Sequence, residues 1–156
     1  YTSSAYWLDI GTHEKYLQLH RDLLNGKCHQ HVLDLRHDVL IGAESNLHPS
    51  AQIMGPVVIG DSCFIGREVK LIGPSVIGSG GNIMANSVVD GSIIWPNTWI
   101  GPGVNVKNSI LANRCFLHAN SVVEESVLGD NVIVCDSCRL KLDSRIFPGT
   151  IVGAET

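Results

Sequence analysis

Residues 41–89 read IGAESNLHPSAQIMGPVVIGDSCFIGREVKLIGPSVIGSGGNIMANSVV. Every sixth residue of this stretch is aliphatic, namely Ile41, Leu47, Ile53, Ile59, Ile65, Leu71, Ile77, Ile83 and Val89. An α-helix repeats near 3.6 residues and a half-buried strand near 2, so neither explains a period of six. A fixed period is typical of repeat architectures, in which each unit buries its apolar face against its neighbours.

The period continues towards the end of the chain, but it shortens to five residues at 89→94, 106→111 and 123→128. Three steps per coil then give coils of 18, 18, 17, 17, 17 and 18 residues. Such a coil has three flat sides with one inward aliphatic residue each, and sides of successive coils pair as parallel strands about 4.8 Å apart. The first column is Ile41, Ile59, Ile77, Ile94, Leu111, Leu128 and Ile146. The second is Leu47, Ile65, Ile83, Ile100, Leu117, Val134 and Val152. The third is Ile53, Leu71, Val89, Val106, Val123 and Leu140.

Small residues recur at two further positions of the repeat. Glycine often directly follows a column residue, as at Gly42, Gly60 and Gly78, where we expect a corner that needs a small or positive-φ residue. Four residues after a column residue we expect a small inward side chain. This slot holds Ser45, Ala51, Cys63, Ser75, Ser87, Thr98, Cys115, Ser121, Cys138 and Thr150.

The five cysteines include a Cys-x-x-Cys pair, Cys135 and Cys138. Such a pair can be half a zinc site or a redox couple. Because Cys63, Cys115 and Cys138 share the small inward slot, we interpret them as packing residues. An odd cysteine count without a visible signal peptide favours reduced thiols and a cytoplasmic location.

Composition excludes several classes of partner. The net charge is −4 and the sequence pI is near 5.9, so no basic patch is expected for nucleic acid or an anionic membrane surface. No apolar run approaches the ~20 residues that span a bilayer. At 44% hydrophobic and 6% aromatic residues, the core must be mainly aliphatic.

A short helix precedes the repeats. Thr12 is a suitable N-cap, Glu14 suits the first turn of a helix over residues 13–25, and Gly26 suits its end. A helix this short is marginal alone, so its apolar face must pack on something. We therefore divide the chain into an end of a preceding domain with helix and connector, 1–34, and a repeat domain, 35–156.

The pattern [Leu/Ile/Val]-Gly-x-x-[small]-x resembles the hexapeptide repeat of left-handed parallel β-helices. The resemblance implies an all-β fold of about six to seven left-handed coils after the short α-helical segment. Two enzyme classes carry this fold. Hexapeptide acyltransferases build their active site between coils of a trimer, and sugar nucleotidyltransferases carry the β-helix as a C-terminal appendage.

The segment from Tyr6 to Leu17 resembles the closing motif of the sugar-1-phosphate nucleotidyltransferase domain, Trp-x-Asp-[Ile/Thr]-Gly-Thr-x-x-x-[Tyr/Leu]. The stretches 55–60, 73–78 and 126–130 resemble the mannose-1-phosphate guanylyltransferase branch. The resemblance implies a parent reaction of a nucleoside triphosphate with a sugar 1-phosphate, in which Asp9 is a Mg²⁺ ligand. The family's glycine-rich nucleotide loop and its other metal-binding aspartate do not occur in this sequence. We therefore expect the chain alone to be catalytically inactive and without tight Mg²⁺ binding.

Two alternatives remain open. In a hexapeptide acyltransferase, His118 would be the general base because it follows Leu117, and His48 holds the equivalent position after Leu47. The cluster of Cys28, His29 and His31 could bind a transition metal, although adventitious binding by a connector is the simpler interpretation. A non-catalytic scaffold, such as the nucleotidyltransferase-like subunits of the translation-initiation exchange factor, is the second alternative.

Large aromatic residues point to an interface. Trp95 takes a position where other coils have glycine or alanine, so it should project outwards. Trp99 lies in the same coil, and Phe147 falls in the same column as Trp95 near the C-terminal end. The ends of a β-helix are open sheet edges that need covering. A homo-oligomer is therefore expected. The coil alignment also predicts that Asp90 and Lys107 lie on adjacent coils of one face.

Overall fold

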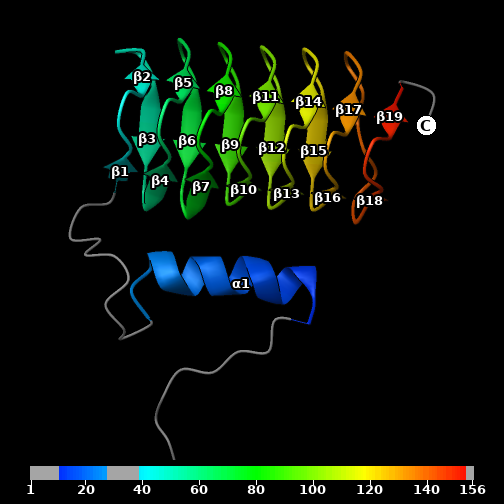
Figure 1. The fold of residues 1–156 in the computed structure, drawn as a ribbon, viewed down its shortest axis with the longest axis horizontal. Coiled ribbons are helices and arrows are strands. Elements are labelled where there is room, and N and C mark those ends of the chain that lie inside the picture. The colour runs from blue at the N-terminus through cyan, green and yellow to red at the C-terminus, as the bar shows by residue number, and fades with distance from the viewer. Residues whose placement is uncertain (1–10, 28–38, 154–156) are drawn as a thin grey trace, which may run out of the picture.

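The computed structural model describes residues 11–27 and 39–153, and its one helix in this part, α1 (His13–Leu24), precedes nineteen short strands. The strands form a rod of stacked coils (Figure 1). Their bounds are β1 Val39–Ile41, β2 Asn46–Leu47, β3 Gln52–Met54, β4 Val57–Ile59, β5 Phe64–Ile65, β6 Lys70–Ile72, β7 Ser75–Ile77, β8 Asn82–Ile83, β9 Val88–Asp90, β10 Ile93–Ile94, β11 Trp99–Ile100, β12 Asn105–Lys107, β13 Ile110–Leu111, β14 Phe116–Leu117, β15 Val122–Glu124, β16 Val127–Leu128, β17 Ile133–Val134, β18 Arg145–Ile146 and β19 Ile151–Val152.

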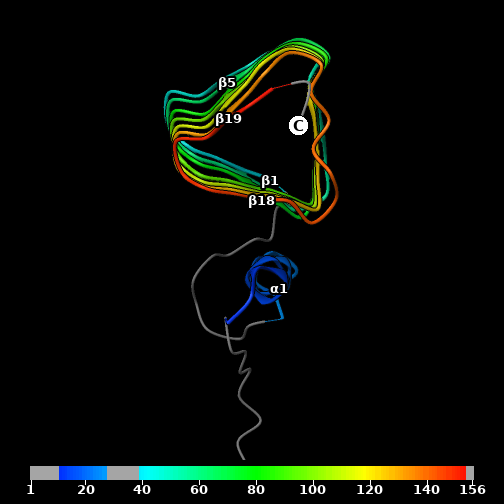
Figure 2. The same ribbon diagram turned by 90° about the vertical axis from the view of Figure 1, so that its right-hand side faces the viewer.

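Three parallel sheets form the three sides of the rod, which is triangular when viewed along its axis (Figure 2). We name them sheet A (β1-β4-β7-β10-β13-β16-β18), sheet B (β2-β5-β8-β11-β14-β17-β19) and sheet C (β3-β6-β9-β12-β15). In sheet A the register pairs Ile59 with Ile77 and Ile77 with Ile94, steps of 18 and 17 residues. The predicted parallel β-helix and its coil lengths are confirmed.

The inward columns make the core. Ile65, Ile100 and Leu117 of the second column are each 0% exposed, and most residues of the other two columns belong to the same buried cluster, with Ile53 and Ile146 partly buried against it. Ile41 departs from the prediction because its side chain is 52% exposed. It lies in β1, which among the described strands pairs only with β4 of sheet A, so no described coil covers it from the other side.

The glycines after column residues have a different role from the predicted one. None of Gly42, Gly60 or Gly78 has a positive φ. A Cβ at Gly78 would lie 2.6 Å from the backbone nitrogen of Pro96 in the next coil, so glycine is needed for the close approach of coils. Left-handed residues instead follow the column residues of all three columns by two or three positions, as at Ser62 after Ile59, Glu68 after Ile65 and Gly91 after Val89.

The small inward slots are confirmed in the inner coils, whereas Ser45 and Ala51 near the first coil are half-buried and Thr150 in the last coil is exposed. Cys63, Ser87 and Ser121 are 0–2% exposed. In the coils shortened by one residue, the slot falls three positions after the third column, which the sequence analysis did not anticipate. There, Ser92, Ser109 and Ser126 extend a ladder of buried serines from Ser75, which itself lies at the predicted fourth position after Leu71. In this ladder the backbone N–H of each of the three donates to the hydroxyl of the preceding serine at 3.0–3.1 Å.

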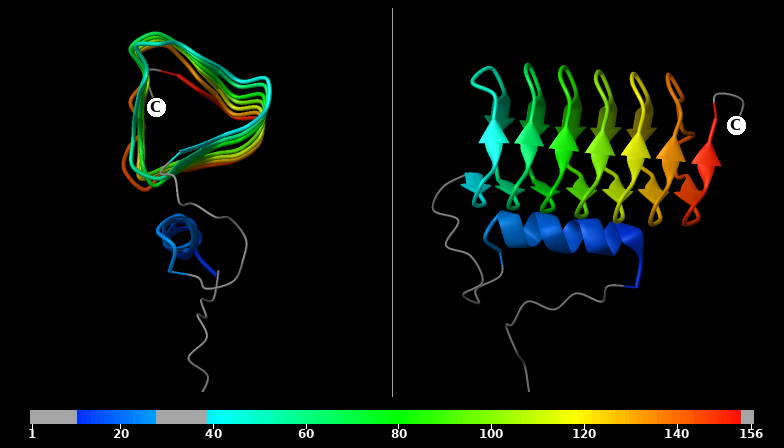
Figure 3. Two further views of the ribbon diagram at one scale, coloured as in Figure 1. Left: turned by 90° about the vertical axis from the view of Figure 1, so that its left-hand side faces the viewer. Right: turned by 45° about the horizontal axis from the view of Figure 1, so that its top comes forward.

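The predicted adjacency of Asp90 and Lys107 is confirmed, since these residues pair in register between β9 and β12 of sheet C. The carboxylate of Glu124, on the following coil, lies 3.6 Å from Arg139. α1 lies outside the rod alongside sheet A (Figures 1, 2 and 3). Within the described residues, no helix is both long and apolar enough to cross a membrane.

Candidate functional site

α1 covers a second apolar column, on the outside of sheet A. The residue before each first-column residue points outwards, because side chains alternate along a strand. In register these outward residues are Leu40, Val58, Val76, Ile93, Ile110, Val127 and Arg145. Ile93 and Ile110 are 4% and 6% exposed although they do not belong to the core inside the rod. Leu24 of α1 is 7% exposed, so helix and sheet bury apolar side chains together.

The start of α1 is built as the sequence predicts. Thr12 has extended backbone angles, and its hydroxyl accepts a hydrogen bond of 3.3 Å from the backbone N–H of Lys15. The backbone N–H of Glu14, and then the Thr12 hydroxyl, lower the pKa of the Glu14 carboxyl below its usual 4.5; Arg145 acts in the same direction. A carboxylate is thereby held at the positive end of the helix dipole.

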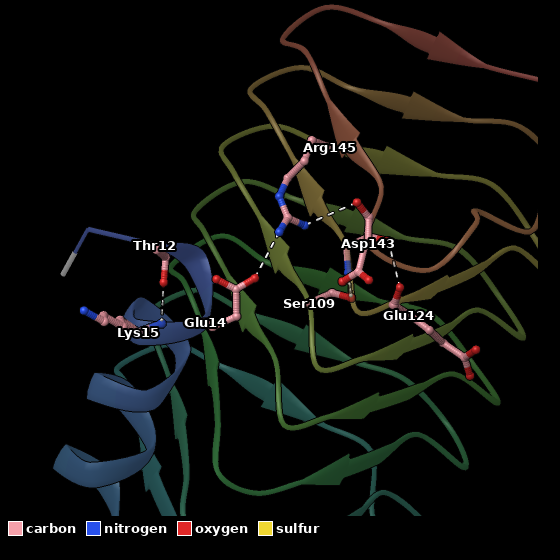
Figure 4. Close-up of polar contacts among 8 residues, drawn as sticks. Thr12, Glu14, Lys15, Ser109, Glu124, Asp143 and Arg145 are labelled. Atoms are coloured by element: carbon pink, nitrogen blue, oxygen red, sulfur yellow. Dashed lines mark hydrogen bonds and ion pairs between the residues drawn. The ribbon is translucent and has the colours of Figure 1, made fainter.

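Two arginines connect α1 to the rod across long sequence separations. Arg21 of α1 donates a hydrogen bond of 2.9 Å to the side-chain oxygen of Asn108. Arg145 of β18 lies 3.0 Å from the Glu14 carboxylate and donates to the backbone oxygen of Asp143 at 3.4 Å (Figure 4). Because residue 14 meets β18 and residue 21 meets an earlier coil, α1 runs along the rod towards its first coils.

A polar groove of about 320 Å³ lies between α1 and the rod. We name it the α1 groove; it is lined by His13, Glu14, Leu17, Gln18, Arg21, Asn108, Glu125, Ser126, Val127, Asp143 and Arg145. A hollow of about 500 Å³ adjoins it around Gly11, Tyr16 and Arg145. The groove brings cationic and anionic side chains together in similar numbers, so its charges largely neutralise one another.

Side chains that could bind a metal ion are not clustered in the part of the chain that the structure describes. Residues 11–27 and 39–153 contain no group of three or more His, Cys, Asp or Glu side chains placed to hold a metal ion. Asp9, the Mg²⁺ ligand implied by the resemblance, lies outside the described residues, as do Cys28, His29 and His31.

The histidines proposed as bases lie far from one another on the rod. The His118 ring packs against the Phe116 ring, with centroids 4.8 Å apart. His48 lies four coils earlier, and its Nδ1 is 2.8 Å from the Ser50 hydroxyl. These contacts hold each ring locally, and neither includes a carboxylate that would orient a catalytic base.

The three residues predicted for an interface lie on the outside. Trp95 and Phe147 are 39% and 81% exposed, and both directly follow a first-column residue. Trp99 is half-buried and stacks on Phe116 at 5.6 Å between ring centroids. The outward projection of Trp95 is therefore as expected, while the role of these residues as an interface stays a prediction.

The thiols of Cys63, Cys115 and Cys138 lie at the small inward positions of the coils. Cys115 and Cys138 are 1% and 2% exposed, and Cys63, Cys115, Cys135 and Cys138 are all free. Burial raises the pKa of the Cys115 thiol to about 11 and also raises that of Cys138. A protonated, buried thiol is a poor nucleophile and a poor metal ligand.

The sequence analysis missed the outward column of sheet A and the two arginines. A signal for the column is present, because the strands of sheet A read as apolar at two successive residues, the pattern of strands buried on both faces. No local signal marks Arg21 or Arg145, since their partners are 87 and 131 residues away in the chain.

No protein-family model matches the chain. Among curated proteins it is 33% identical over 113 residues to a UTP–glucose-1-phosphate uridylyltransferase of Synechocystis, covering 69% of this chain and 29% of the relative. It is 25% identical over 140 residues to a glucose-1-phosphate adenylyltransferase of Desulfitobacterium hafniense, covering 90% of this chain and 31% of the relative. It is 31% identical over 110 residues to the bifunctional protein GlmU of Mycobacterium tuberculosis, covering 60% and 22%. The chain thus spans about a third or less of these relatives.

Among solved structures, the chain is similar to the acetyltransferase domain of PglB from Neisseria gonorrhoeae, whose structure contains acetyl coenzyme A. The TM-score is 0.55 at 18% identity, with 76% of this chain and 55% of that domain covered. Similarity at this level of identity concerns the fold alone.

Proposed function

We propose that this chain, which is homologous to sugar-1-phosphate nucleotidyltransferases, is the hexapeptide β-helix part of an enzyme of that class. In the reaction that the resemblance implies, the phosphate of a sugar 1-phosphate attacks the α-phosphate of a nucleoside triphosphate, and pyrophosphate leaves. The chain's own part is to support the enzyme's assembly or regulation through the rod.

The observation that carries this proposal is the order of elements. A segment resembling the closing motif of the nucleotidyltransferase domain leads into α1, and α1 packs lengthwise on sheet A of the rod. Arg21 and Arg145 hold α1 at two points along its length. A helix fixed in this way can set the position of a domain attached to its start relative to the rod.

Within the class, we propose the mannose-1-phosphate guanylyltransferase type, from the Gly-Pro-x-x-Ile-Gly stretches 55–60 and 73–78. The relatives named above include uridylyl- and adenylyltransferases for glucose 1-phosphate, so the test must compare bases and sugars directly. A cytoplasmic location, with the thiols reduced, belongs to the same proposal.

The test is an assay of pyrophosphate release by the protein as its gene encodes it, beside the 156-residue chain alone. GTP with mannose 1-phosphate, UTP with glucose 1-phosphate and ATP with glucose 1-phosphate form the substrate panel. We expect release with the guanylyl pair from the gene-encoded protein and none from the chain alone. Turnover of another pair corrects the specificity only, whereas turnover of no pair supports the scaffold alternative.

Mg²⁺ binding gives a second test, because the carboxylates of the described residues are not clustered. We expect isothermal titration of the 156-residue chain with Mg²⁺ to show no tight binding. Micromolar affinity would contradict the interpretation of the chain as a part without the reactive site.

The acyltransferase alternative is favoured by one observation, the fold shared with an acetyltransferase domain. It requires a histidine base, and His118 instead packs on Phe116. Incubation of the chain with acetyl coenzyme A and amino sugars tests it. Thioester cleavage that is lost in His118→Ala would establish this alternative and refute the nucleotidyltransferase proposal for the rod.

A further inference from the structure

Aromatic side chains stand in a row on the outside of sheet B, and one asparagine interrupts them. The residue before each second-column residue points outwards, and the register places these residues side by side on successive coils. In order along the rod they are Asn46, Phe64, Asn82, Trp99, Phe116, Ile133 and Ile151. Asn82 therefore has Phe64 on the coil before it and Trp99 on the coil after it.

The indole ring of Trp99 has one face stacked on an aromatic ring and the other face turned towards Asn82. It lies parallel to the Phe116 ring, with 3° between the planes and 5.6 Å between the centroids. Because Phe116 belongs to the next coil, the opposite face of the indole is directed at the coil of Asn82. The short amide side chain of Asn82 carries no ring, so a planar ring can still stack on that face.

The spacing of the coils suits one planar ring between Phe64 and Trp99. Successive coils are about 4.8 Å apart, so the two aromatic residues are attached about 9.6 Å from each other. A ring midway between them would lie about 4.8 Å from each, within the range of about 4.5–7 Å that stacked aromatic centroids show. Phe64 is 41% exposed, and no ring of the described residues stacks on it, so its own ring is available to a ligand.

The amide of Asn82 supplies hydrogen-bonding groups between the two rings. Its Nδ2 donates a hydrogen bond of 3.0 Å to the backbone oxygen of Gly80, which fixes the plane of the amide. A side-chain amide has two N–H donors and one oxygen acceptor, so one donor and the oxygen remain to pair with a ligand. Asparagine pairs in this way with a ring edge that carries a donor beside an acceptor, such as the N6 and N7 groups of adenine.

Charge restricts the ligand further. No Asp, Glu, Lys or Arg occurs within the strands of sheet B. The whole chain carries a net charge of −4, which disfavours an anion such as a phosphate group. The part of the ligand that these three residues hold is therefore uncharged.

We propose that Phe64, Asn82 and Trp99 form a binding site, the Asn82 site, for a neutral planar heterocycle with a hydrogen-bond donor beside an acceptor on its edge. Adenine is a ring of this kind. The ring lies between the two aromatic side chains and pairs with the amide, as proteins hold unpaired bases. This site does not rest on the proposed nucleotidyltransferase function, because it includes neither α1 nor the segment before it.

NMR titration of the ¹⁵N-labelled 156-residue chain with adenosine tests the proposal. Stacking on two faces with one amide pairing predicts a dissociation constant of about 1 mM. We expect shifts of the Trp99 indole N–H and of the Asn82 side-chain amide. Inosine, which has an oxygen in place of the amino group, should bind at least about fivefold more weakly. AMP should bind within about threefold of adenosine, because no opposite charge meets its phosphate.

Asn82→Ala and Phe64→Leu should each weaken adenosine binding at least about fivefold, because the first removes the pairing and the second one stacked face. Asn46→Ala is the matched control. Asn46 stands in the same row but has an aromatic neighbour, Phe64, on one side only in the described coils. It should bind as the unchanged chain does, and all three variants should keep the circular dichroism spectrum and the thermal midpoint.

Four results would overturn the proposal. The first is a titration without shifts at Trp99 or Asn82 up to about 10 mM adenosine. The second is binding that Asn82→Ala or Phe64→Leu leaves unchanged. The third is inosine that binds as well as adenosine. The fourth is AMP that binds at least about tenfold more tightly than adenosine, which would assign the binding to a phosphate site elsewhere on the chain.

Discussion

The outer faces of sheets A and B each carry an apolar column, and the two columns lie in different environments. Ile93 and Ile110 of sheet A are 4% and 6% exposed, whereas Phe116 and Ile151 of sheet B are 38% and 65% exposed. In both sheets the residues concerned directly precede an inward column residue. The difference is that α1 covers sheet A, while no helix or strand of residues 11–27 and 39–153 covers the outside of sheet B (Figure 2).

The outer apolar column of a β-helix can be buried in two ways. An element of the same chain can cover an outer apolar column, and its hydrogen bonds, such as that of Arg21 with Asn108, then fix its position. A column left bare is a candidate for contact between molecules, because soluble proteins seldom expose extended apolar patches without a function. The following predictions test which side chains are buried inside the rod or under α1 and which remain exposed.

Thiol reactivity should show the largest contrast. With Cys28 replaced by serine, we expect Cys135, which is half-buried at the margin of sheet B, to be alkylated at least about 100-fold faster than Cys115 at pH 8. Cys115 is 1% exposed, and burial raises its pKa to about 11, which alone reduces its thiolate fraction about 100-fold. Mass spectrometry of the alkylated chain measures both rates, and equal rates would contradict the inward placement of Cys115.

The same pKa predicts an alkaline loss of stability. Because the folded-state pKa of Cys115 lies above its usual value of 9.0, the unfolded chain loses the thiol proton first. The contribution of this thiol is complete below pH 9 and is lost as the pH rises towards 11. The thermal midpoint should therefore fall over this range, and less so in Cys115→Ser. An equal fall in that variant would assign the effect to other groups.

Truncation of the two outer columns should give the next largest contrast. Ile110→Ala should lower the free energy of unfolding by about 2–3 kcal/mol, because it leaves a cavity under α1. Phe116→Ala, on the same coil, should cost about 1 kcal/mol or less in the monomer, since it loses mainly the Trp99 stack. Urea denaturation at low protein concentration measures both, and equal losses would mean that α1 does not cover sheet A in solution.

The attachment of α1 should be sensitive to Arg21. Arg21→Met removes the hydrogen bond to Asn108 and should cost about 1 kcal/mol, seen as faster proteolysis within residues 13–24. Arg114→Met is the control, because Arg114 donates a similar 3.0 Å hydrogen bond to Asn131 within the rod. If both variants change cleavage of the helix equally, Arg21 does not hold α1 to the rod.

The smallest expected effect concerns Glu14. Its lowered pKa means that the charged carboxylate stabilises the folded state above the usual value of 4.5, and that this contribution is lost as the pH falls through the folded-state pKa. Thr12→Val should raise the Glu14 pKa towards 4.5 in a carboxyl-detected NMR titration. Arg145→Met should raise it less, because the charge of Arg145 contributes less than the Thr12 hydroxyl. The opposite order would identify Arg145 as the main cause.

Much of the rod could be predicted from the chain alone. The six- and five-residue steps predicted the registers, such as Ile77 with Ile94. The residue type at Thr12 predicted the N-cap of α1. Both follow from local rules, namely one inward side chain per side and one cap per helix. The glycines after column residues were predicted to form positive-φ corners, but Gly78 is needed for the close approach to Pro96. That approach depends on the neighbouring coil and has no local signal.

The candidate site could be predicted only in part. Trp95 was expected to project outwards from its place in the repeat, and it does. The α1 groove was not anticipated, because Arg145 and Glu14 are 131 residues apart and no local signal predicts their contact. The serine ladder was also missed, since the shortened coils move the inward slot by one residue.

The amino-acid sequence by itself determined which side chains point into the rod and how long each coil is. Those properties depend on the alternation of side chains along a strand and on a strict period, both of which can be read without coordinates. Only the tertiary structure decided that Ile110 is covered and Phe116 is bare, although both stand in the same position of the repeat. That choice depends on where α1 packs, and the packing of a separate element is set by contacts between residues far apart in the chain.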